Sequence, residues 1–260
     1  MKRFLTAALA ALSLAAAAQA QTEVRLAVHK SFSLPKDAFA AFEKSNNAKV
    51  SVIKVGSGNE MVNKLILSRA KPIADAVYGL DNTTILKAKQ AGILAGEMKP
   101  VDYGYITLNY DKAWFAKHKL PLPQSLADLA KPQYRNLLVV PNPGMSSTGL
   151  GFLLANIQGL GEKAAFDWWA KMRANGVKVA KDWSEAYYTE FTQNGGSRPL
   201  VVSYASSPAA EVFYSKGKYS EPPTANLNLK GGVFRQTEGT AVLKGAAQPA
   251  LAAKLTAYLQ

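Results

Sequence analysis

The sequence predicts an α/β fold divided into two lobes. Three observations lead to this prediction. Apolar runs of strand length alternate with helical patterns from residue 24 onward, a β-rich run at residues 101–110 interrupts the alternation, and the alternation then resumes. A return strand is expected at residues 233–243. Two lobes joined by two crossover strands are typical of a hinged binding protein whose ligand lies in the cleft between them.

The elements of the first lobe follow from hydrophobic periodicity. Strands are expected at residues 24–28, 49–55 and 74–80, and helices at residues 35–44, 59–69 and 83–91. Such alternation favours a mostly parallel sheet covered by helices on both faces. Because ligands of these sheets gather at the carboxyl ends of strands, Ser57, Gly58, Asp81 and Asn82 are expected at a ligand-binding rim.

The second lobe is expected to repeat the pattern. Its predicted strands are residues 137–140, 177–180 and 200–204, and its predicted helices are residues 125–130, 148–159, 162–175 and 184–191. We therefore assign residues 21–103 and 233–260 to lobe 1 and residues 104–232 to lobe 2. The expected hinge strands lie near residues 102–106 and 233–236.

The first 20 residues have the features of a cleavable secretory signal peptide. Lys2 and Arg3 precede an Ala/Leu-rich run, and Ala18 and Ala20 supply small residues before the expected cut. The run is too short for a stop-transfer helix, and no second hydrophobic run of about 20 residues follows. A lipoprotein anchor would need a cysteine, and the chain has none. We expect a soluble protein in the periplasm or elsewhere outside the cytoplasm.

Composition narrows the functional class further. Without cysteine there can be no disulfide, thiol nucleophile or thiolate metal site. Hydrophobic residues make up 48% of the 260 positions, enough for one large or two smaller cores. The formal net charge is +13, but the lysines are scattered and no run of five like charges occurs, which indicates a solvated surface rather than a nucleic-acid interface.

One hydroxyl-rich segment predicts an anion site. An apolar strand runs through a Pro-Asn-Pro-Gly turn into a helix start that carries Ser146, Ser147 and Thr148. The first turn of a helix has backbone N–H groups without intrahelical partners and a partial positive charge, and the hydroxyls add donors. Gly149 would let the backbone come close to a ligand. The alternative is an ordinary Ser/Thr cap on a buried helix.

The order and spacing of five segments resemble those of the periplasmic thiamine-binding proteins of ABC importers. These segments are Asp81-Asn82, Asp102-Tyr103-Gly104 and residues 146–151, 183–187 and 203–208. The resemblance covers most of residues 24–258. It implies a type II periplasmic-binding-protein fold and a monomer that captures thiamine, thiamine monophosphate or thiamine diphosphate without a cofactor. It also implies delivery of the ligand to a membrane permease.

The resemblance and the residue chemistry together predict the contacts. An indole face attracts an organic cation by roughly 0.5 to 2 kcal/mol, so Trp183 suits the thiazolium, with Tyr204 as the second aromatic residue. Asp81 could meet the cation or the exocyclic amine, although a helix cap is its alternative role. Ser146 and Ser147 would receive a phosphate. The complete predicted set is His29, Ser57, Asp81, Asn82, Ser146, Ser147, Thr148, Gly149, Trp183, Tyr187 and Tyr204.

The chain departs from the family pattern at several positions. The family reads Tyr-Asp-Ser-Phe after its first strand and Glu-Asp-Gly after its second, whereas residues 29–32 are His-Lys-Ser-Phe and residues 56–58 are Gly-Ser-Gly. A family tyrosine is replaced near Ala209 and Ala210, and the sequence ends at Gln260 where the family continues, which implies a shortened, incomplete lobe 1. Because Lys30 and Ser57 replace two acids, we hypothesise that phosphate esters bind better than free thiamine, or that the ligand has changed.

Three other classes are weighed against a thiamine receptor. Ferric-ion binding proteins of the same fold use paired tyrosines, but Tyr187 and Tyr188 would diverge by about 100° on a helix. A hydrolase would need a base near a serine, and the two histidines, His29 and His118, accompany neither a Gly-x-Ser-x-Gly nor a His-Glu-x-x-His motif. A purely structural protein would not need the converging aromatic, hydroxyl and acidic rim. We therefore expect no enzymatic activity.

Overall fold

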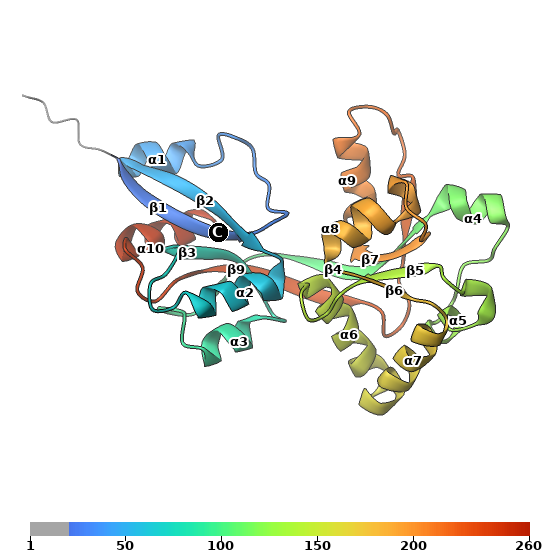
Figure 1. Ribbon diagram of the computed structural model, residues 1–260. Coiled ribbons are helices and arrows are strands. Elements are labelled where there is room, and N and C mark those ends of the chain that lie inside the picture. Colours follow the sequence, from blue (N-terminus) through green and yellow to red (C-terminus); the bar gives the residue numbers. More distant parts are fainter. Residues whose placement is uncertain (1–20) are drawn as a thin grey trace, which may run out of the picture.

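The computed structural model describes residues 21–260, so the predicted signal peptide at residues 1–20 lies outside the described residues. The described chain forms two α/β lobes that lie side by side in Figure 1, connected by strands β4 (Lys99–Asp111) and β9 (Phe234–Val242). All strands belong to one sheet, in the order β2-β1-β3-β9-β4-β7-β5-β6, with β8 paired to β4. The two-lobed α/β prediction is thereby confirmed, while the exact lobe boundaries stay a prediction.

Lobe 1 contains the amino-terminal elements and the last helix. Its elements are β1 (Thr22–His29), α1 (Ala40–Asn46), β2 (Ala48–Gly56), α2 (Gly58–Leu67), β3 (Ala76–Asp81), α3 (Ile85–Gln90) and α10 (Pro249–Tyr258). Strand β1 pairs in parallel with β2 and β3. Leu26 packs with Phe42 and Leu255 on one face of the sheet, whereas Ala27 packs with the α2 side on the other face. Helices on both faces explain why β1 is a nearly continuous apolar run.

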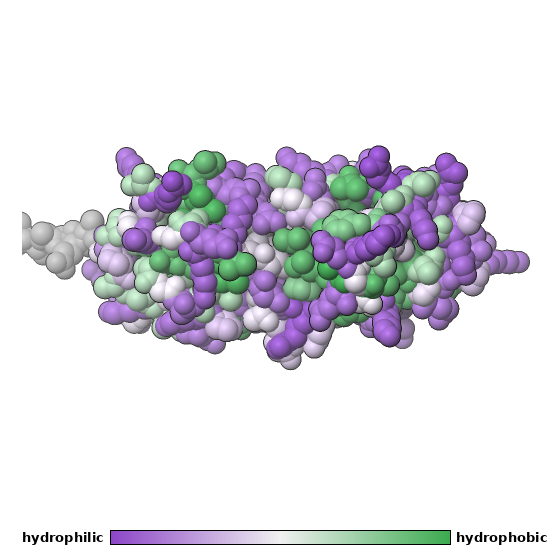
Figure 2. Space-filling view, turned by 90° about the horizontal axis from the view of Figure 1, so that it is seen from below, coloured by the Kyte–Doolittle hydropathy of each residue, from purple (hydrophilic) through white to green (hydrophobic). Residues whose placement is uncertain are grey.

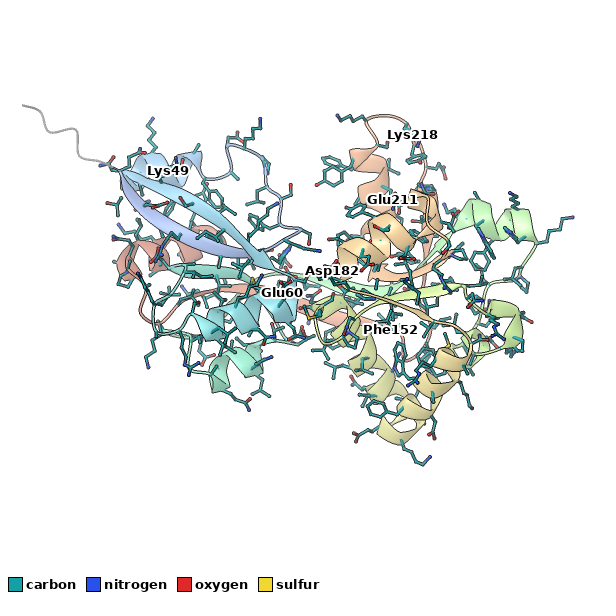
Figure 3. The ribbon with its side chains drawn as sticks, viewed as in Figure 1. Lys49, Glu60, Phe152, Asp182, Glu211 and Lys218 are labelled. Carbon is teal, nitrogen blue, oxygen red and sulfur yellow. The ribbon has the colours of Figure 1, made fainter. Side chains whose placement is uncertain are left out.

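Lobe 2 is built around a second core. Its elements are α4 (Lys112–His118), α5 (Leu126–Leu129), β5 (Leu138–Pro141), α6 (Ser147–Leu160), α7 (Glu162–Ala174), β6 (Lys178–Ala180), α8 (Trp183–Glu185), β7 (Leu200–Tyr204), α9 (Ser207–Tyr214) and β8 (Thr224–Leu227), with short turns of 3-10 helix at Pro132–Tyr134 and Thr192–Asn194. Phe152 of α6 is fully buried against the β4 and β7 strands and against Trp168 of α7 (Figure 3). This packing fixes the direction in which α6 leaves the sheet.

The sequence predicted most of these elements. The expected strands at residues 24–28, 49–55, 74–80, 137–140, 177–180, 200–204 and 233–243 are confirmed as β1, β2, β3, β5, β6, β7 and β9. The helix predicted at residues 35–44 begins only at Ala40, because Pro35 and Asp37 start tight turns instead. The helix predicted at residues 184–191 is a short α8 followed by a π-helical turn, Ala186–Glu190. The prediction missed α4, α9, α10 and β8.

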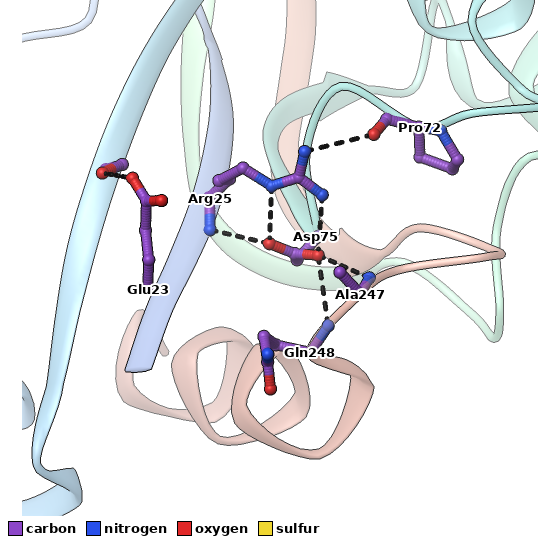
Figure 4. Close-up of polar contacts among 7 residues, drawn as sticks. Glu23, Arg25, Pro72, Asp75, Ala247 and Gln248 are labelled. Carbon is purple, nitrogen blue, oxygen red and sulfur yellow. Dashed lines mark hydrogen bonds and ion pairs between the residues drawn. The ribbon is translucent and has the colours of Figure 1, made fainter. Parts of the chain in front are cut away.

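A buried carboxylate ties lobe 1 together (Figure 4). Asp75 is fully buried and accepts hydrogen bonds from the Arg25 backbone amide and from both Nε and Nη2 of the Arg25 guanidinium, at 2.9 to 3.1 Å. It also accepts from the backbone amides of Ala247 and Gln248, just before α10. Burial alone would raise the pKa of Asp75, but the donors from Arg25 and from the two amides hold it below its usual value. Strands β1 and β3 and the start of α10 therefore meet at one group.

The surface is mixed in character. In the face shown in Figure 2, apolar side chains form separate patches on both lobes among hydrophilic side chains. Within residues 21–260, no helix is both long enough and apolar enough to cross a membrane.

Candidate functional site

The cleft between the lobes is lined from both sides and from the connecting strand β9. One part of it, the inner pocket, is lined by His29, Lys30, Ser31, Ser57 and Gly58 of lobe 1, Ser146, Ser147, Thr148, Trp183 and Tyr204 of lobe 2, and Gln236 and Glu238 of β9, among others. A central hollow of about 310 Å³ shares His29, Trp183, Tyr204 and Glu238 with it. An outer hollow of about 610 Å³ adjoins at Ser31 and Trp183. Seven of the predicted site residues thus come together.

Two helix N-termini meet at the inner pocket. Helix α6 begins after Ser146, and helix α2 of the opposite lobe begins after Ser57 in a capping box with Glu60. A Cβ atom on Gly58 would lie 2.0 Å from the Ser147 Oγ, so only glycine lets the two helices approach this closely. Because unpaired N–H groups and partial positive charge arise at both helix starts, the pocket favours an anionic group.

The hydroxyls of α6 have different partners. Ser147 is 7% exposed, and its Oγ has no hydrogen-bond partner among the described residues, although it lines the pocket. Such an unpaired buried hydroxyl is costly unless a ligand or a water molecule pairs with it. The Thr148 Oγ1 lies 3.1 Å from the Tyr204 hydroxyl, which joins α6 to β7 at the base of the site. The unpaired Ser147 hydroxyl is therefore a specific donor that supports the predicted anion site.

Gly149 lies where α6 packs on the end of β5. A Cβ atom at this position would lie 2.2 Å from the carbonyl oxygen of Pro141, the last residue of β5. The glycine lets the first turn of α6 pack directly on the end of the strand. It does not line any of the three hollows.

Trp183 is the aromatic residue common to all three hollows. Its ring stacks on Tyr187 with centroids 5.2 Å apart and lies 5.9 Å from the ring of Tyr204, while its Nε1 donates to the Ser203 Oγ at 2.8 Å. These contacts fix the indole at the cleft surface. Tyr187 lies behind it and lines only the outer hollow, where its hydroxyl donates to Glu211.

Asp81 and Asn82, two residues of the predicted site, lie outside the three hollows. Asp81 is fully buried: its Oδ1 accepts from the backbone amides of Thr83 and Thr84, and its Oδ2 accepts from the Gln236 Nε2 at 2.7 Å. These bonds stabilise the turn that precedes α3, whose own N-cap is Thr84. Asn82 bonds the backbone of β9 at residues 235 and 237 and lines none of the hollows. Both residues fasten β3 to β9 behind the cleft.

The carboxylate that does face the cleft is Glu238, which the prediction missed. It lines both the inner pocket and the central hollow, and burial, followed by the negative charges of Asp102 and Asp81, raises its pKa to about 8. The sequence shows a glutamate in the return strand, but it does not show which side chains lie beside it in the sheet. Those neighbours depend on how β9 pairs with β3 and β4, which are distant in the sequence.

His29 and Lys30 form the lobe 1 side of the cleft. Burial lowers the pKa of His29, an effect that Asp102 and Asp81 partly oppose, so the imidazole is neutral at pH 7. The Lys30 Nζ forms an ion pair with Asp182, the residue that caps α8 in lobe 2 and lies where the lobes meet in Figure 3. A second contact crosses the cleft from the Asn59 Nδ2 to the Pro143 carbonyl, at 3.2 Å. The lysine charge is therefore balanced by Asp182.

The tyrosine pair considered for iron is divided between two environments. Tyr187 is buried and bonded to Glu211, whereas Tyr188 is 59% exposed, and their rings are inclined by 85°. Within residues 21–260, no group of three or more His, Asp or Glu side chains is placed to hold a metal ion. His118, the other histidine, stacks on Trp114 at the end of α4.

Comparisons with known proteins agree on one family. The family model for bacterial extracellular solute-binding proteins matches residues 73–259. The thiamine-binding periplasmic protein of Salmonella typhimurium is 31% identical over 236 residues, which cover 84% of this chain and 68% of that protein. The solved structure of a periplasmic thiamin binding protein, 29% identical, superposes with a TM-score of 0.78 over 92% of this chain and 78% of its own. An iron-bound protein of Pseudomonas aeruginosa, HitA, has the same fold at 18% identity, with a TM-score of 0.72 over 92% and 80% of the two chains.

Proposed function

The chain belongs to the thiamine-binding periplasmic proteins, within the bacterial extracellular solute-binding family and with the type II periplasmic-binding-protein fold, and we propose that it captures thiamine or its phosphate esters in the cleft. Its mature form is exported after removal of residues 1–20. It acts outside the cytoplasm as a receptor without catalytic activity and hands its ligand to the permease of an ABC importer.

The observation that carries the proposal is the convergence of two helix N-termini, the unpaired Ser147 Oγ and Trp183 on one cleft. A thiamine phosphate ester carries an anionic group, a cationic ring and a flat aromatic ring. The phosphate suits the inner pocket, where N–H and O–H donors converge. The rings suit the central and outer hollows, both of which the Trp183 indole borders, where stacking and cation–π attraction act together.

Delivery follows from lobe closure. Strands β4 and β9 connect the lobes, and the cleft residues come from both, so a bound ligand contacts both lobes in the closed form. A ligand shifts such an equilibrium only by its differential affinity for the closed state. The ion pair between Lys30 and Asp182 also stabilises the closed state, because it joins the two lobes. The permease would then recognise the closed arrangement of the two lobes.

Calorimetric titration of residues 21–260 with thiamine, thiamine monophosphate and thiamine diphosphate tests the proposal directly. We expect saturable binding of all three, with the phosphate esters tighter than free thiamine. If free thiamine binds as tightly as its esters, the ester preference is wrong. If none of the three binds to the folded protein, the assignment of the ligand is wrong.

Ser147→Ala is expected to weaken monophosphate binding by about 10-fold while leaving free thiamine binding unchanged. A hydrogen bond to a charged group contributes roughly 1.5 to 3 kcal/mol, and this hydroxyl has no competing partner within the described chain. Ser45→Ala, at an exposed position of α1, is the matched control. Equal losses for thiamine and its monophosphate in Ser147→Ala would place the phosphate elsewhere.

A further inference from the structure

Three acidic residues lie in one row across three neighbouring strands. In the sheet register, Glu238 of β9 is the partner of Asp81 of β3 on one side and of Asp102 of β4 on the other. Adjacent strands are about 4.8 Å apart, and like charges directly opposite each other are destabilising. No lysine, arginine or histidine of residues 21–260 forms an ion pair with any of the three. The row therefore brings three acidic groups together, without a basic partner in the described chain, at the point where the lobes join.

The three carboxylates differ in how they are satisfied. Asp81 is saturated by amide and hydroxyl donors around the start of α3. Asp102 accepts from the hydroxyl of Tyr78. Glu238 accepts from the Gln236 Nε2 at 3.1 Å, also interacts with the Tyr78 hydroxyl, and lines the cleft. Of the three, Glu238 is the one that combines exposure to the inner pocket with incomplete compensation.

Within residues 21–260, no positively charged side chain forms an ion pair with Glu238 or contributes to its pKa shift. The titratable and polar groups facing it are His29 from β1, Tyr78 and Asp81 from β3, Asp102 from β4, Tyr204 from β7 and Gln236 from its own strand. The nearby Lys30 is engaged by Asp182. The unpaired Ser147 Oγ lines the same inner pocket, which is an independent indication that a ligand occupies this space.

We propose that Glu238 is the specificity-determining carboxylate of the cleft: it receives the positively charged part of the ligand, and ligand binding releases a proton from it. This inference rests on the proposed function, because it concerns the same cleft and a cationic ligand. The direction of the proton transfer follows from the environment of Glu238. With a pKa of about 8, Glu238 holds its proton at neutral pH, and a bound cation favours the ionised form. Affinity for the cation therefore rises with pH between 6.5 and 9.

The test is calorimetry of residues 21–260 with thiamine at pH 6.5 and pH 9.5, each in two buffers of different ionisation enthalpy. We expect roughly half a proton released per ligand at pH 6.5 and almost none at pH 9.5. Glu238→Gln is expected to abolish the release and to weaken thiamine binding at pH 9.5 by about 30-fold. The neutral thiophene analogue of thiamine, the matched probe, should bind wild type and Glu238→Gln equally. Glu23→Gln, on an exposed strand end, is the control variant.

Unchanged thiamine affinity and unchanged proton release in Glu238→Gln would overturn the proposal. If wild type binds neither thiamine nor its esters, the proposed function fails separately, and a ligand-independent experiment still decides the role of Glu238. In that experiment the Glu238 carboxyl resonance is followed by NMR against pH with and without tetramethylammonium chloride. A lower titration midpoint with the cation supports the proposal, and an unchanged midpoint contradicts it.

The same charge row gives a stability prediction without any ligand. Because the pKa of Glu238 is higher in the folded chain than in the unfolded chain, its protonation stabilises the fold at low pH, and this stability is lost as pH rises toward and through 8. Glu238→Gln should therefore melt several degrees above wild type at pH 9 and at the same temperature as wild type at pH 4. Thermal melts followed by circular dichroism measure both. A mutant without this gain at pH 9 would show that the row is not repulsive.

Discussion

Trp183→Ala is expected to lower the affinity for thiamine and its monophosphate by about 100-fold, the effect of roughly 3 kcal/mol. The indole is the one aromatic side chain that borders the inner pocket, the central hollow and the outer hollow, where Ser31 is the other shared residue. Its loss would remove the stacking surface and the cation–π partner from every part of the cleft. Isothermal titration calorimetry of wild type and mutant measures the difference.

Two further variants show whether the effect belongs to the cleft. Trp183→Phe keeps an aromatic face but loses the Nε1 donor to Ser203, so we expect an intermediate affinity. Trp114→Ala removes a tryptophan that stacks on His118 at α4, outside the three hollows, and should bind as wild type does. If Trp183→Ala retains wild-type affinity while its melting curve shows an intact fold, the ligand does not contact this indole.

The sequence predicted the order of elements well because that order is written in local periodicity. Strand β1 and strand β7 are short apolar runs, and α6 follows a turn and a hydroxyl-rich start. Each signal lies within a dozen residues of chain, so long-range contacts are not needed to read it. Helix α10 has the same kind of signal, with Pro249 in its first turn and Leu255 in the core, and could have been predicted.

The site was predicted only in part because a cleft joins distant segments. The start of α6 was predicted from its residue types, and Trp183 from its residue type together with the family resemblance. The ion pair of Lys30 with Asp182 joins residues 152 positions apart, and the partners of Glu238 depend on the pairing of β9 with two other strands. Asp81 illustrates a further difficulty: its position at the end of β3 suggested a ligand contact, yet the turn amides of Thr83 and Thr84 and the distant Gln236 side chain already pair with its carboxylate. Position along a strand does not determine which side chains are already paired.

Asp75→Ala is expected to destabilise the protein by about 3 to 5 kcal/mol, because it leaves the guanidinium of Arg25 without its buried partner. The same change removes the acceptor for the amides of Ala247 and Gln248 that precede α10. For a chain of this size, each kcal/mol lowers the melting temperature by about 2 to 4 °C. Thermal or urea unfolding of wild type and mutant at pH 7 measures the loss.

The matched control is Asp167→Ala, which breaks the exposed pair of Asp167 with Lys163 on α7. Pairs of that kind contribute roughly 0 to 1 kcal/mol, so its melting temperature should stay close to that of wild type. The two variants lose the same charge, and a large difference between them isolates the effect of burial and of the donors around Asp75. Equal melting temperatures would mean that the other contacts of α10, among them the packing of Ala252 and Leu255, hold it on the sheet without Asp75. Since the pKa of Asp75 is lowered in the folded chain, its contribution is present at pH 7 and is lost as pH falls below 4. The gap between wild type and Asp75→Ala should therefore narrow in acid, which a repeat of the melts at pH 3 would reveal.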